Sequence, residues 1–164
     1  MSSLYTSITV AEAVRDCVAT DAALLAWSRA TYTATPTVYL GVDEDQPAEA
    51  GAYPVIGLVN LRRTGSLAAN AIVWELDLGC AVLDDRVLTT AATTGQAATR
   101  TYPGLQQANY LTELVEAALL QSHLFISVTF SGESGAIADY PVFVSYSTLS
   151  LGLRASSRHP RFRS

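Results

Sequence analysis

The chain of 164 residues contains no lysine, and all ten of its basic residues are arginine. A phosphate-binding loop of the Walker A type is therefore excluded, because its lysine contacts the phosphates. A Schiff-base lysine and a lysine general base are excluded for the same reason. Several large classes of enzyme are thus ruled out by one missing residue type.

Cysteine and histidine are also scarce, with two of each. Cys17 falls on a helical apolar stripe and Cys80 on the apolar parity of a strand, so we expect two buried small side chains. A disulfide would need an oxidising compartment that nothing else indicates. Neither His123 nor His159 has a partner at catalytic or metal-ligand spacing. We expect no catalytic residue, no metal and no cofactor.

Long apolar runs are missing as well. No run approaches the ~20 residues that cross a bilayer, and the first residues lack the basic head and apolar stretch of a signal peptide. The net charge of −5 argues against a protein that coats nucleic acid. We therefore expect a soluble chain with no membrane partner that is made in a cytoplasm.

What the sequence does contain is regular periodicity. Apolar spacing predicts a helix from Thr9, which either ends near Asp21 or continues past it, and a second main helix from Pro103 to about Ser122. Alternation predicts strands at 35–42, 55–63, 71–82, 124–130 and 140–154. We predict an α+β fold, with a mostly antiparallel sheet of about five strands covered by two main helices. Residues 1–153 are expected to form one domain, and 154–164 a basic C-terminal tail.

The last predicted strand changes the phase of its alternation. Its apolar residues fall first on even numbers and then on odd numbers: Val142, Val144 and Tyr146, then Leu149, Leu151 and Leu153. Such a change indicates a bulge, or a strand whose second half buries its other face. We expect the second half to pack on another subunit, which makes the three leucines candidate interface residues.

Glu75 and Asp77 are the best candidates for chemistry. They share the polar parity of strand 71–82, with Cβ atoms ~7 Å apart, a spacing compatible with paired carboxylates that act on a bond. No histidine lies nearby to complete a metal site. The competing interpretation, a solvated or subunit-interface face, is favoured.

Two further segments lack a predicted partner within the domain. Residues 84–104 are rich in threonine and alanine with no clear period, and loops of this length are usually functional or flexible. The tail carries four arginines and no acid: Arg154, Arg158, Arg161 and Arg163. It is either a frayed, solvated terminus or an arm that binds an acidic surface or phosphate.

The order of elements resembles the tail terminator (tail-completion, minor tail protein U-like) family of long-tailed bacteriophages. The resemblance covers roughly residues 8–153 and rests on pattern rather than on a signature motif. A helix with "DAALLAW" precedes an acidic linker and the strands "YPVIGL" and "VWELDL". A long loop, a helix with "YLTELVEAAL" and a closing hairpin follow.

This resemblance implies a structural virion protein of the tail-neck region without catalytic residues. Such a protein forms a ring, typically a hexamer, that caps the tail tube, ends its polymerisation and joins it to head-neck connector proteins. DNA would pass through the lumen without sequence-specific binding. In such a ring, Glu75 and Asp77 would either face the lumen and repel DNA or bind an arginine of the next subunit, and Arg158, Arg161 and Arg163 would contact a partner.

Two alternatives stay open at this point. A head-completion or stopper protein of the phage neck is also small, acidic and ring-forming, but binds the portal side rather than the tube. A small monomeric ligand-binding or enzymatic α+β domain would instead hold Glu75 inside a defined pocket.

Overall fold

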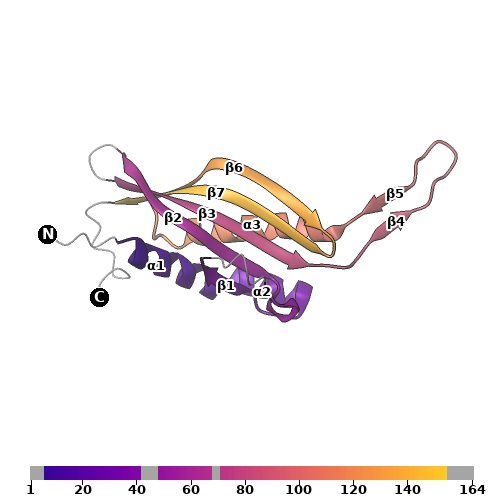
Figure 1. The fold of residues 1–164 in the computed structure, drawn as a ribbon, viewed down its shortest axis with the longest axis horizontal. Helices are drawn as coiled ribbons and strands as arrows, with labels where there is room; N and C mark the ends of the chain where they lie inside the picture. Colours follow the sequence, from indigo (N-terminus) through magenta and orange to yellow (C-terminus); the bar gives the residue numbers. More distant parts are fainter. Residues whose placement is uncertain (1–5, 42–47, 68–70, 155–164) are drawn as a thin grey trace.

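A computed structural model describes residues 6–41, 48–67 and 71–154 of the chain. It consists of one twisted sheet with helices on one face and a thin hairpin that extends away from the body (Figure 1). The elements are α1 Ser7–Thr20, α2 Ala22–Tyr32, β1 Thr37–Leu40, η1 Ala50–Ala52, β2 Val55–Leu67, β3 Ala71–Leu83, β4 Leu88–Thr90, β5 Thr99–Thr101, α3 Pro103–Gln121, β6 Ser127–Asp139 and β7 Val142–Arg154.

The main sheet has five strands in the order β1-β2-β3-β7-β6. β1 is parallel to β2, and every other pair in this sheet is antiparallel. The β3–β7 pairing is continuous, whereas β2 and β6 contain register shifts, the latter between Phe130 and Ser134. The predicted α+β class with a mostly antiparallel sheet of about five strands is confirmed.

The helices begin where short polar side chains cap their first amides. The Thr6 hydroxyl accepts a hydrogen bond from the Thr9 amide at 3.2 Å, and the Thr9 hydroxyl accepts one from the Thr6 amide at 3.0 Å. Asp21 ends α1 and caps α2 by accepting from the Leu24 amide at 2.8 Å. The N-terminal helical pattern is therefore two helices, and Thr6 rather than Thr9 is the first cap.

The core lies between the sheet and the helices. α3 packs on β3, β7 and β6, while α1 packs on β1, β2 and α3. Even-numbered residues of β3 face this core, and Trp74, Leu76 and Cys80 are at most 4% exposed. Both cysteines are buried, as predicted. No helix in the described ranges is long and apolar enough to cross a membrane.

The expected subunit contact of the last strand is wrong. Leu149, Leu151 and Leu153 are at most 1% exposed and belong to the core of the single chain. The apparent change of phase arises because Ser145 and Ser147 occupy the same core-facing row as the leucines and are 5% exposed. Polar residues in a buried row break the apolar alternation without any bulge in the strand.

The last hairpin also differs from the sequence prediction. Residues 131–139 were expected to form its loop because they are rich in glycine and serine. They instead continue β6 as far as Asp139, and the turn lies at Tyr140 and Pro141. The register shift before Ser134 absorbs the extra residues, which is how a strand accommodates a segment of this composition.

Candidate assembly surfaces

Glu75 and Asp77 lie on the face of the sheet opposite the helices, where Arg62 of β2 binds both. The Arg62 Nε and Nη2 atoms are each 3.0 Å from Glu75 Oε2, and Nη1 is 3.0 Å from Asp77 Oδ2. Asn60 donates to Asp77 Oδ2 at 3.1 Å, and Thr148 donates to Oδ1 at 2.9 Å. These residues come from three adjacent strands, so the sheet register itself assembles the cluster.

Hydrogen bonding dominates the electrostatics of this cluster. Partial burial would raise the pKa of Asp77, but hydrogen bonds from Thr148, Asn60 and Arg62 outweigh it and hold that pKa below its usual range. The same hydrogen bond to Asp77, followed by its charge, raises the pKa of Arg62. Both carboxylates thus accept hydrogen bonds from neighbouring side chains. This arrangement does not suit a general acid, which must donate a proton.

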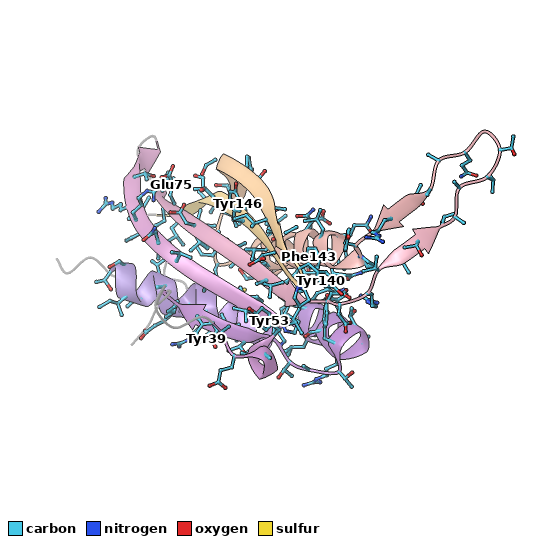
Figure 2. The ribbon with its side chains drawn as sticks, turned by 45° about the vertical axis from the view of Figure 1, so that its right-hand side comes forward. Tyr39, Tyr53, Glu75, Tyr140, Phe143 and Tyr146 are labelled. Atoms are coloured by element: carbon cyan, nitrogen blue, oxygen red, sulfur yellow. The ribbon has the colours of Figure 1, made fainter. Side chains whose placement is uncertain are left out.

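The arginine that binds Glu75 and Asp77 belongs to the same chain. Arg62 binds both carboxylates through the β2–β3 register, and the expected contact with an arginine of the next subunit stays a prediction. With one guanidinium between two carboxylates the cluster has a net charge of −1, which weakens the case for repulsion of DNA. Figure 2 shows Glu75 far from Tyr140 and Phe143, which mark the opposite end of the sheet.

The same open face is apolar toward that opposite end. The register aligns Val55, Ala81, Val144 and Ile137 in one row across four strands. Ile137 is 57% exposed, and Tyr146, one row away, is 40% exposed. Within the described residues no helix covers this face (Figure 1), and contiguous exposed apolar surface of this kind is typical of protein contacts.

The hairpin formed by β4 and β5, residues 88–101, is the most unusual surface feature, and we call it the arm. It extends away from both the sheet and the helices (Figure 1). Every residue from 85 to 102 is exposed. β4 and β5 pair over three residues each, and Thr93 and Gln96 exchange two backbone hydrogen bonds of 3.0 Å near the tip, where Gly95 has φ +86°.

The composition of the arm does not favour independent stability. Of its fourteen residues six are threonine and four alanine, and Arg100 is the one charged residue. A two-stranded hairpin that buries no apolar face is marginally stable in water. The arm therefore buries little of its own surface, and it occupies the stretch that the sequence predicted to be functional or flexible.

A buried ion pair holds the base of the arm. The side chain of Asp84 is 2% exposed and accepts from the Arg86 amide at 3.0 Å and from Arg86 Nε at 2.8 Å, with a second guanidinium contact from Nη2. These hydrogen bonds lower the pKa of Asp84 despite burial. The Asp84 amide also donates to the Pro141 carbonyl at 2.9 Å, which ties the arm to the β6–β7 turn.

Aromatic side chains pack at the same base. Tyr102, Tyr140 and Phe143 form three ring contacts with centroids 5.9 to 6.4 Å apart. The Tyr140 hydroxyl donates to the Asp85 carbonyl at 2.9 Å. Figure 2 shows Tyr140 and Phe143 close together where the arm leaves the sheet. The arm therefore has a rigid base, although its own strands bury little.

Burial raises the pKa of the nearby Tyr32 hydroxyl to about 12, with a further contribution from the charge of Asp84. Tyr32 is thus a neutral phenol throughout the physiological range. Trp27 contacts Tyr32 and Tyr110 edge-on, with centroids 5.6 and 5.9 Å away, and so joins α2 to α3 beside the base.

The remaining sequence candidates divide between the described and undescribed parts. Arg158, Arg161 and Arg163, predicted to contact a partner, lie outside the described residues. His123 follows the end of α3 with φ 56°. Among residues 6–41, 48–67 and 71–154, no three His, Cys, Asp or Glu side chains gather as they would around a metal ion.

Sequence reasoning found the segment of the arm but not its structure. The available signals were paired β-branched runs, Thr89–Thr90 and Thr99–Thr101, on either side of Gly95. The aromatic base was missed because Tyr102 is about 40 residues from Tyr140 in the sequence.

Comparison with known proteins adds no relative. No protein-family model matches the chain, and a search of curated proteins finds no match.

Proposed function

We propose that this chain is a structural virion protein of a long-tailed bacteriophage that forms a ring, caps the tail tube and joins it to the head-neck connector. The observation that carries the proposal is the arm, an exposed hairpin on a packed aromatic base that no other described part of the chain covers. Head-to-tail rings use such heterologous contacts, in which one surface of each subunit binds a different surface of the next.

The open sheet face supports the same proposal. It combines a partly exposed apolar row, in which Ile137 is exposed and the other three residues are half-buried, with a satisfied polar cluster around Arg62, which matches the apolar centre and polar rim of protein interfaces. The acidic groups with a candidate catalytic spacing, Glu75 and Asp77, are bound by arginine. This favours a structural role over the monomeric enzymatic alternative, in which a carboxylate would be available to substrate.

Two measurements test the proposal. Sedimentation velocity over a wide concentration range should show reversible assembly to a closed ring, and the wild-type chain should bind the open end of tube formed by the tail-tube protein of the same phage. Capping should arrest further growth of the tube in the presence of excess tube subunits. Tubes that keep growing, with no bound chain at their ends, would contradict the proposal.

A stopper protein of the neck is the second candidate, and the same binding assay separates the two. A terminator binds tube protein in the absence of portal protein, whereas a stopper binds on the portal side. A chain that binds portal assemblies and does not bind tubes would be a stopper protein of the neck rather than a terminator.

A further inference from the structure

The core-facing row of β7 contains two serines, Ser145 and Ser147, whose small side chains leave a space in the core. Ser145 and Ser147 continue the row of Leu149, Leu151 and Leu153 beneath α3, yet their side chains are much smaller. A row of leucines would fill the space between the sheet and α3. The serines leave a pocket of about 400 Å³ between α3 and the ends of β6 and β7.

One polar group beside this pocket lacks a partner among the described residues. Ser147 is a lining residue, and its hydroxyl is buried without a hydrogen bond. A buried hydroxyl without a partner is unfavourable, so a donor or acceptor from another molecule that reached it would be stabilising. β6, which forms one wall, is the edge strand of the sheet.

The other wall is acidic. Glu113 and Glu116 of α3 both line the pocket, and neither forms an ion pair with a described residue. Burial, and then the charge of Glu113, raises the pKa of Glu116. A cation between the two carboxylates would offset the repulsion between them and favour the charged form of Glu116 in spite of its burial.

The arm has the complementary properties. Its one charge is the guanidinium of Arg100, and the residues beside it, Thr99 and Thr101, are small and carry hydroxyls. Arg100 forms no ion pair within the described residues and is exposed. The arm points away from its own body (Figure 1), so the pocket that it fits belongs to another copy.

We propose that Arg100 of one copy inserts between Glu113 and Glu116 of the next, with the adjoining threonines of the arm against Ser147. This inference rests on the proposed ring and specifies its head-to-tail contact. Arginine suits the position because its planar guanidinium donates five hydrogen bonds in a fixed geometry. The contact is heterologous, so each copy donates one arm and receives one.

Charge exchange is the first test. Arg100→Glu alone and Glu113→Arg with Glu116→Arg should each raise the concentration needed for half-assembly at least tenfold. The triple variant, which restores opposite charges across the contact, should return it to within about threefold of wild type. Arg63→Glu is the matched control, because Arg63 is exposed and forms no ion pair among the described residues.

Covalent capture is the second test, and it does not require a stable ring. Chains with Arg100→Cys and chains with Glu113→Cys are mixed under mild oxidation; both native cysteines are buried. A disulfide-linked heterodimer is expected only in the mixture. Its absence at concentrations more than tenfold above those at which wild type assembles would overturn the inference and leave the ring intact, and its absence together with a monomeric wild type would overturn both. Linkage without tube capping would sustain this contact and reject the terminator function.

Discussion

The carboxylate of Asp84 is buried, whereas the guanidinium that it binds is half-exposed. Breaking the contact would therefore leave the buried carboxylate, rather than the half-exposed guanidinium, poorly solvated and without its partner. Because its folded-state pKa lies below the unfolded value of ~3.9, its contribution to stability is present above that value. The contribution is lost as pH falls through the folded pKa.

Asp84→Asn should lower the free energy of unfolding at pH 7 by roughly 1–3 kcal/mol, because it removes the charged acceptor of several hydrogen bonds. The difference from wild type should shrink below about pH 4, where the wild-type carboxylate becomes protonated. Urea unfolding at a series of pH values measures both. Asp85→Asn, at the exposed neighbour, is the control, and an equal loss there would contradict the assignment.

Gly104 is a second residue on which the base of the arm depends. A Cβ at this position would lie 2.3 Å from Phe143 Cδ2 and 2.9 Å from Asp84 Cβ. Gly104→Ala should therefore destabilise the fold by about 1–3 kcal/mol through overpacking. At Gly79 a Cβ meets nothing within 4 Å, so Gly79→Ala should leave the thermal midpoint unchanged or raised. Similar thermal midpoints for the two variants would show that the aromatic side chains at the base of the arm rearrange at little cost in stability.

At the scale of elements, β7 belongs to the folding of a single chain. Leu149→Ala should reduce the free energy of unfolding of the monomer by about 2–5 kcal/mol, because a fully buried leucine leaves a cavity. Leu120→Ala, at a leucine that is 57% exposed on α3, should change it by less than about 0.5 kcal/mol. Equal effects in denaturant titrations of the monomer would restore the interface interpretation.

The arm should be dispensable for folding. Replacement of residues 88–101 by a short glycine linker removes only exposed residues, so far-ultraviolet circular dichroism and the thermal midpoint should stay close to wild type. Assembly, measured by sedimentation, should be lost in the same variant. A variant that unfolds would show that the arm packs on its own body, and one that still assembles would place the subunit contact elsewhere.

The success of sequence prediction also differs between elements. β3 was predicted almost to its ends, because Trp74, Leu76 and Leu78 alternate with the acidic residues Glu75 and Asp77. β6 was predicted to end at Phe130, because the glycine and serine residues that follow in this edge strand are typical of a loop. The arm was not predicted, since a threonine-rich hairpin without a core has no apolar period to detect.

At the scale of the whole molecule, the candidate surfaces come from tertiary proximity that one sequence does not display. Arg62 reaches Glu75 and Asp77 only through the register of two strands with intervening bulges. The pocket beneath α3 exists because two serines interrupt a row of leucines, and sequence alone interpreted that interruption as a change of face. Composition could not place the arm relative to the sheet.

The stiff base of the arm has a geometric consequence for any closed assembly. Six copies turn through about 60° at each contact and five copies through about 72°, so about 12° separates the two closures. A flexible arm would tolerate that difference and give a mixture of circles and open spirals. The angle fixed by Asp84, Tyr140 and Phe143 would then set the curvature of the proposed ring and the diameter of its lumen.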